Sequence, residues 1–104
     1  MKLKEFPGQS ILEALCNHAL SVRFDGLEFQ ARLLSFELQK LTALANPPDK
    51  RKNAEGKAYT PKCLRLVFDT GALVVVLEDC QLVAMHNGAA FIFDSYQLEV
   101  RRAD

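Results

Sequence analysis

The stretch that decides the fold is LSVRFDGLEFQARLLSFEL, which occupies residues 20–38. Apolar and polar side chains alternate through residues 20–24, which is the pattern of a strand with one buried face. Asp25 and Gly26 follow, and both residue types accept the positive φ that a two-residue hairpin turn requires. The sequence therefore predicts two antiparallel strands joined by a tight turn.

The alternation of the returning strand changes phase partway. Its apolar positions are odd-numbered as far as Leu33 and even-numbered from Leu34 to Leu38. Because successive side chains of a strand point to opposite faces, this change predicts a bulge or sharp bend at Leu33-Leu34 within one long strand. Residues 37–45, which follow, fit either a helix or a further strand. Their apolar residues have helical spacing, whereas a third strand at this point would suit a small barrel.

A short helix is predicted in front of the hairpin. Ser10 and Glu13 have the spacing of a capping box, in which each side chain satisfies a free amide of the first turn. Apolar residues at intervals of three and four extend the pattern over about residues 10–19. A helix of this length is stable only when it packs on another element, so it should lie on the sheet.

Asn46-Pro47-Pro48 ends whatever precedes it, because proline disfavours helical geometry before it and donates no hydrogen bond. Residues 46–62 are predicted to form a long polar loop. The remainder is rich in β-branched and apolar residues and in turn dipeptides. The predicted strands are 63–69, 72–78, 80–86, 89–94 and 96–101, with turns at Thr70-Gly71 and at Asn87-Gly88.

The strand around residues 72–77 reads ALVVVL and has no polar alternation. Both of its faces should therefore be covered. Two arrangements satisfy this requirement: a central position between layers, or an interface with a second subunit. The second arrangement predicts a homo-oligomer with Leu73, Val74, Val75 and Val76 at its interface.

Residues 20–38 and 64–82 also resemble each other. Each segment places Phe-Asp before a glycine-containing turn, at Phe24-Asp25 and at Phe68-Asp69. A duplicated hairpin and a chance recurrence of strand and turn chemistry both explain the similarity.

Charge is balanced overall but not along the chain. The 104 residues carry 13 basic and 13 acidic side chains, which excludes attraction of the whole protein to DNA or to an anionic membrane. Residues 1–48 are neutral, residues 49–62 have a net charge of +3 and residues 63–104 have −3. A basic loop with an aromatic residue is typical of nucleic-acid or anion binding, but a loop kept soluble by its lysines is the simpler explanation. The candidate residues for such binding are Lys50, Arg51, Lys52, Lys57, Tyr59 and Lys62.

Few residues have the spacing that catalysis or metal binding requires. Three cysteines follow no disulfide or zinc pattern, and the chain has no phosphate-binding glycine loop. Cys16 and His18 form the only short-range pair of a thiol and an imidazole. We therefore expect no catalytic residue, metal or cofactor, with a small thiol- or metal-dependent enzyme as the alternative.

The segment FDGLEFQARLLSFE, residues 24–37, resembles the first motif of Sm-like proteins, the family that includes the bacterial Sm-like RNA chaperone. With the preceding helix, the resemblance covers residues 9–44. It implies a strongly bent five-stranded barrel that assembles by strand addition into a ring and binds single-stranded RNA. Residues 63–104 have no counterpart of the second motif of that family.

Together these patterns predict a single α+β domain over residues 1–104. A short N-terminal helix should lie on a strongly bent antiparallel sheet, or on a small SH3-like or Sm-like barrel, with about six to seven strands. No segment approaches the roughly 18 consecutive apolar residues of a membrane span, so we expect a cytoplasmic protein. The expected function is non-enzymatic binding with self-association, and the alternative is Sm-like RNA binding.

Overall fold

The computed structural model describes residues 6–40 and 51–103. Its helices are α1 (Gln9–Leu15) and the 3₁₀ helix η2 (Leu77–Asp79). Its strands are β1 (Ala19–Phe24), β2 (Leu27–Lys40), β3 (Arg51–Lys52), β4 (Ala58–Tyr59), β5 (Lys62–Phe68), β6 (Gly71–Val76), β7 (Gln81–Met85), β8 (Gly88–Ile92) and β9 (Gln97–Arg102).

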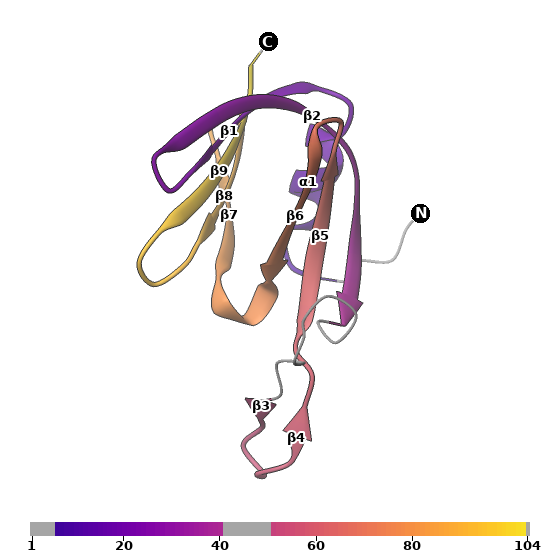
Figure 1. Ribbon diagram of the computed structural model, residues 1–104, viewed down its shortest axis with the longest axis vertical. Coiled ribbons are helices and arrows are strands. Elements are labelled where there is room, and N and C mark those ends of the chain that lie inside the picture. The colour runs from indigo at the N-terminus through magenta and orange to yellow at the C-terminus, as the bar shows by residue number, and fades with distance from the viewer. Residues whose placement is uncertain (1–5, 41–50, 104) are drawn as a thin grey trace.

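Seven strands form one antiparallel sheet in the order β6-β5-β2-β1-β9-β8-β7. The long strand β2 belongs to both halves of this sheet. Its first part pairs with β1 and its second part pairs with β5, so the chain arches from one half to the other (Figure 1). The predicted α+β class with an antiparallel sheet is confirmed. The outer strands are β6 and β7, and no pairing between them closes the described sheet into a barrel.

The predicted bulge in β2 is confirmed. Leu33 is opposite Phe68 and Ser35 is opposite Val67, which leaves Leu34 as an extra residue without a partner on β5. Leu33 is buried whereas the side chain of Leu34 is 48% exposed. The extra residue therefore rotates the strand and moves the following apolar side chains to the core face.

Neighbouring loops hold the bend of β2 in place. The carboxylate of Asp69 accepts a hydrogen bond from the backbone N–H of Arg32 at 3.0 Å. The N–H of Asp69 donates in turn to the carbonyl of Arg32 at 3.0 Å, and the N–H of Asn17 donates to the carbonyl of Leu33 at 2.8 Å. These bonds satisfy backbone groups that the bulge removes from the regular ladder.

The turns agree with the sequence in one hairpin and differ by one position in two others. Asp25 and Gly26 both have positive φ, as predicted for the turn between β1 and β2. In the hairpin of β7 and β8, Met85 pairs with Gly88, so the turn residues are His86 and Asn87 and not Asn87-Gly88. In the hairpin of β5 and β6, Phe68 pairs with Gly71, so the turn residues are Asp69 and Thr70 and not Thr70-Gly71. Both of these turn predictions were wrong because Gly71 and Gly88 already belong to strands.

The predicted capping box is wrong. Helix α1 follows Gly8, which has a φ of 89°, and no side chain caps its first turn. Glu13 instead accepts a hydrogen bond at 3.0 Å from the side-chain amide of Gln9. The helix ends at Leu15 and not near residue 19, because Asn17 takes a positive φ that turns the chain toward β1.

The region predicted as a loop, residues 46–62, contains a hairpin. Strands β3 and β4 pair with each other, and the side-chain oxygen of Asn53 accepts hydrogen bonds from the N–H groups of Glu55 and Lys57 at 2.9 and 3.0 Å. The Asx-type turn that they form was not recognised in the sequence. The ambiguous segment 37–45 continues as a strand through Lys40, and residues 41–50 lie outside the described part of the chain.

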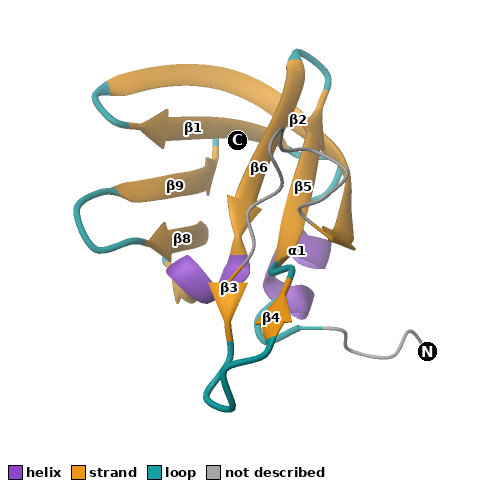
Figure 2. Ribbon diagram, turned by 60° about the horizontal axis from the view of Figure 1, so that its bottom comes forward, coloured by secondary structure: helices purple, strands orange, loops and turns teal. Residues whose placement is uncertain are grey.

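The core lies between the two half-sheets, which face each other (Figure 2). Leu12 and Leu15 of α1 belong to the same cluster, so the helix lies on the sheet as predicted. Buried strand residues from one half are Leu20, Val22, Phe91, Leu98 and Val100, and those from the other are Leu33, Leu64, Leu66, Phe68 and Val75.

Candidate interaction site at the edge of the sheet

Strand β6 is one outer strand of the sheet, with β5 as its only described neighbour. This position contradicts the predicted central placement of residues 72–77. The two-residue turn after Phe68 places β6 outside β5, and η2 then connects β6 to β7, the outer strand at the other edge of the sheet. An outer strand presents a row of unpaired N–H and C=O groups.

The four predicted interface residues all lie on this edge strand. Val75 faces the core and is buried, whereas the side chain of Val74 is 41% exposed; Leu73 and Val76 are half-buried. Between Gly71 and Val76 the strand has no charged residue, proline or bulge, the features that usually protect an outer strand from pairing. The run without alternation therefore coincides with an edge strand that, within its own residues 71–76, has none of these protective features.

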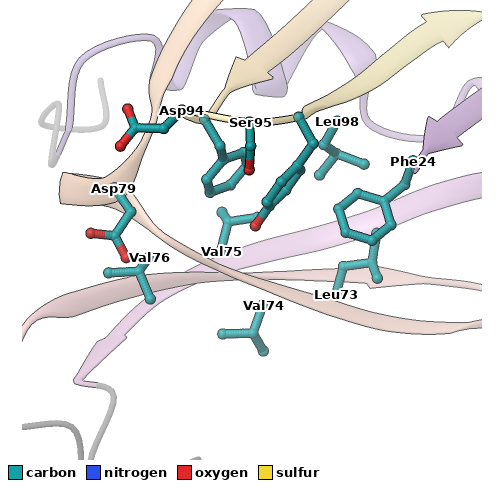
Figure 3. Close-up of a pocket in the computed structure, with 11 residues that line it drawn as sticks. Phe24, Leu73, Val74, Val75, Val76, Asp79, Asp94, Ser95 and Leu98 are labelled. Carbon is teal, nitrogen blue, oxygen red and sulfur yellow. The ribbon is translucent and has the colours of Figure 1, made fainter.

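A groove with a volume of about 340 Å³ runs along β6 (Figure 3). Leu73, Val74, Val75 and Val76 all line it, although successive side chains of a strand point to opposite faces. A cavity on one face of the strand would meet only alternate residues. Since this cavity meets four in succession, it borders the backbone edge, where a further strand would pair.

Aromatic side chains form the opposite wall of the groove. The rings of Phe93 and Tyr96 are stacked, with centroids 4.5 Å apart, and Phe24 meets Tyr96 edge-on at 5.3 Å. The loop between β8 and β9 fixes the stacked pair, because the N–H of Phe93 donates to the carbonyl of Tyr96 at 2.9 Å. The sequence patterns did not predict these residues as part of a site. The one feature of the sequence that could have indicated them is the placement of Phe93 and Tyr96 on the two sides of a short polar turn.

One end of the groove is acidic. Asp79 and Asp94 lie at this end, and Phe24 and Leu73 lie toward the other (Figure 3). None of the eleven lining residues is basic. The groove is therefore polarised, with carboxylates at one end and hydrocarbon at the other.

The hairpin of β3 and β4 is attached beside this acidic end. The guanidinium of Arg51 donates to Asp79 at 2.6 and 2.9 Å and to Glu78 at 2.7 Å. The hydroxyl of Tyr59 donates to the carboxylate of Glu78, with oxygen–oxygen distances of 2.7 and 2.9 Å. The hydrogen bonds from Arg51 lower the pKa of Asp79, and the hydrogen bond to Glu78 raises the pKa of Tyr59.

The candidate residues for nucleic-acid binding are thus divided. Arg51 and Tyr59 are engaged by carboxylates of η2. Lys52, Lys57 and Lys62 are exposed, and Lys50 lies outside the described residues. An anionic ligand at this hairpin would have to compete with Glu78 and Asp79 for Arg51.

The contact between Tyr59 and Glu78 predicts a shifted phenol titration. We expect Tyr59 to ionise at a higher pH in the folded protein than in the unfolded chain, because the phenolate would lose its hydrogen bond and face a carboxylate. The bond therefore stabilises the fold below the ordinary phenol pKa, and this contribution is lost as the pH rises through the raised value. Ultraviolet absorbance of the phenolate, in a Tyr96→Phe background, measures the pKa of Tyr59 alone.

Glu78→Gln should return the pKa of Tyr59 toward its ordinary value. Glu55→Gln, which removes another exposed carboxylate of the same hairpin region, should leave the titration of Tyr59 unchanged. Identical titrations of the parent and the Glu78→Gln variant would contradict the assigned contact.

Cys63 and Cys80 lie in surroundings that disfavour the thiolate. Burial raises the pKa of Cys63, and burial together with the charge of Asp79 raises the pKa of Cys80. Nucleophilic catalysis requires the opposite shift. Cys16 and His18 lie between α1 and β1, and within residues 6–40 and 51–103 no group of three or more histidine, cysteine or acidic side chains could hold a metal ion.

In the part of the chain that the structure describes, no helix has the length and apolar character needed to cross a membrane.

Comparison of the chain with protein-family models, with curated proteins and with solved structures finds no match. The resemblance of residues 24–37 to Sm-like proteins therefore stays a prediction from the sequence.

Proposed function

We propose that this protein is a non-enzymatic interaction domain that binds by adding an extended segment to the free edge of β6, and that a second copy of the chain supplies that segment. The observation that carries the proposal is the groove along β6, which four successive residues line. A strand in this groove would pair with the free backbone groups of β6 on one side and pack against the aromatic wall on the other.

A second copy suits this edge in charge and in shape. In a symmetric dimer, β6 of one copy would pair antiparallel with β6 of the other, so both copies would use the same residues at the interface. Residues 72–76 are Ala-Leu-Val-Val-Val and bring no like charges together. The net charge of the chain is zero, so two copies do not repel each other over long distances.

Val74→Glu tests the proposal with little risk to the fold. Val74 is exposed and lies opposite Arg65 on β5, so the new carboxylate gains a cross-strand partner of opposite charge. In a paired dimer the two introduced carboxylates would meet near the symmetry axis and would repel each other. We expect the wild-type chain to sediment as a dimer or larger species at about 50 μM, and the variant to sediment as an 11.7 kDa monomer.

Ile92→Glu is the matched control. Ile92 is 37% exposed, but its strand β8 is paired on both sides. This variant should sediment like the wild type, and circular dichroism checks that both variants are folded. A wild-type chain that sediments only as a monomer would exclude self-association, and equal dissociation by both substitutions would exclude β6 as the interface.

The alternative is a single-stranded RNA-binding domain that uses the basic hairpin region. Arg51 and Tyr59 favour it less, because Glu78 and Asp79 already occupy their polar groups. Retention of labelled oligo-U on a filter at low salt, lost when Lys52 and Lys57 are changed to alanine, would support this alternative instead.

A further inference from the structure

We propose that the β6 groove also binds an organic cation, with an apolar body against the aromatic wall and an ammonium or guanidinium group at Asp94. This inference goes beyond self-association, because it concerns a small ligand. It rests on the proposed function only for the competition between ligand binding and self-association.

The apolar part of the groove suits the body of such a ligand. Its volume of about 340 Å³ lies in the range of small-molecule sites. Leu73, Val75 and Leu98 supply aliphatic surface, and half-buried Phe24 lies beside Tyr96, which is 41% exposed. The stacked and edge-on contacts hold the rings in position before a ligand enters, so little ordering is needed on binding.

The charges around the groove select a cation. Asp79 is neutralised in part by Arg51, whereas Asp94 forms no hydrogen bond or ion pair with another described residue. The faces of aromatic rings carry a negative quadrupole and attract cations. With no basic side chain in the lining, both the carboxylate and the rings favour a positive group and disfavour a negative one.

Occupation of the groove should oppose self-association. A ligand that rests on the aromatic wall fills the space that a strand paired with β6 would take. The organic cation would then bind the monomer only and shift the equilibrium toward it by mass action. If the protein proves to be monomeric, the binding site remains and only this competition is lost.

Three probes of similar shape separate charge from hydrophobicity: phenethylamine, 2-phenylethanol and 3-phenylpropionate. Their binding is followed by chemical-shift changes of the backbone amides of β6 and of the loop between β8 and β9. The titrations use the wild-type chain at concentrations below those at which it self-associates by sedimentation, because Val74 lines the groove and a carboxylate at that position would add to the charge under test. We expect saturable shifts with phenethylamine, a Kd of about 1 mM, and affinity roughly tenfold above that of 2-phenylethanol. The anionic probe 3-phenylpropionate should bind most weakly of the three.

Asp94→Asn should reduce the affinity for phenethylamine to that for 2-phenylethanol, whereas Glu55→Gln should leave both affinities unchanged under the same conditions. An amine that binds no tighter than the alcohol, or an Asp94→Asn variant that keeps the preference, would overturn the proposal. Sedimentation decides self-association separately, so failure of either proposal is recognised without the other.

Discussion

Replacement of Gly88 by alanine should destabilise the fold by about 3 kcal/mol or more, which lowers the Tm by roughly 12–24 °C for a domain of this size. A Cβ atom at this position would lie 2.1 Å from the carbonyl oxygen of Val100 and 2.8 Å from Cα of Arg101. Both contacts are with the backbone of β9, which cannot move aside as a flexible side chain would. Thermal unfolding followed by circular dichroism measures the loss.

Gly26→Ala is the comparison for this substitution. Gly26 also lies in a hairpin, but no heavy atom lies within 4 Å of the position that its Cβ would take. Its φ of 81° gives alanine only a conformational penalty of about 1–2 kcal/mol. If Gly88→Ala unfolds at the same temperature as Gly26→Ala, then β8 and β9 are not as close as described.

Phe91→Ala should destabilise the fold by about 3–5 kcal/mol. Phe91 is completely buried in β8, and α1 packs against that strand. Truncation leaves a cavity in the core cluster that also contains Leu12 and Leu15 of α1, and a helix of only two turns has little stability without its packing. Urea unfolding monitored at two wavelengths measures the free energy of unfolding.

Ile92→Ala is the neighbouring control, and it should lower the free energy of unfolding by less than about 1 kcal/mol because Ile92 is partly exposed. Similar losses for the two variants would mean that Phe91 does not fill the core as described. An unchanged slope of free energy against urea is expected for both, since neither variant alters the surface exposed on unfolding.

The strands were predictable where the information is local. The alternation around Asp25-Gly26 fixes a hairpin within a few residues, and the phase change at Leu33-Leu34 locates the bulge. Each of these features depends on side chains that are adjacent in the sequence. The order of the strands in the sheet depends on contacts between distant segments and could not be predicted in this way.

The errors share this cause. The frequent turn dipeptide Asn-Gly predicts that Gly88 lies in a turn, whereas its structural requirement is the close approach of β9. The spacing of Ser10 and Glu13 predicts a cap at Ser10, whereas Gly8 starts the helix with a backbone conformation that few other residues adopt. In both cases a glycine was required for a reason that neighbouring residues do not show.

The candidate site was predicted in part. The apolar run at Leu73–Val76 identified one wall of the groove, but its periodicity could not show whether a second layer or solvent lay beside it. The aromatic wall at Phe93 and Tyr96 was missed, because it is assembled from a loop that meets β6 only in the folded sheet. The attachment of Arg51 to η2 was also missed, since 27 positions separate it from Glu78.

The pairing of β1 with β9 has a consequence for the time course of folding. Val22 lies opposite Val100, so the middle of the sheet joins segments near the two ends of the described chain. Such distant contacts form slowly, typically within milliseconds to seconds, because a long loop must close before they stabilise anything. During synthesis the hairpin of β1 and β2 can form early, but one side of β1 stays unpaired until β9 has emerged.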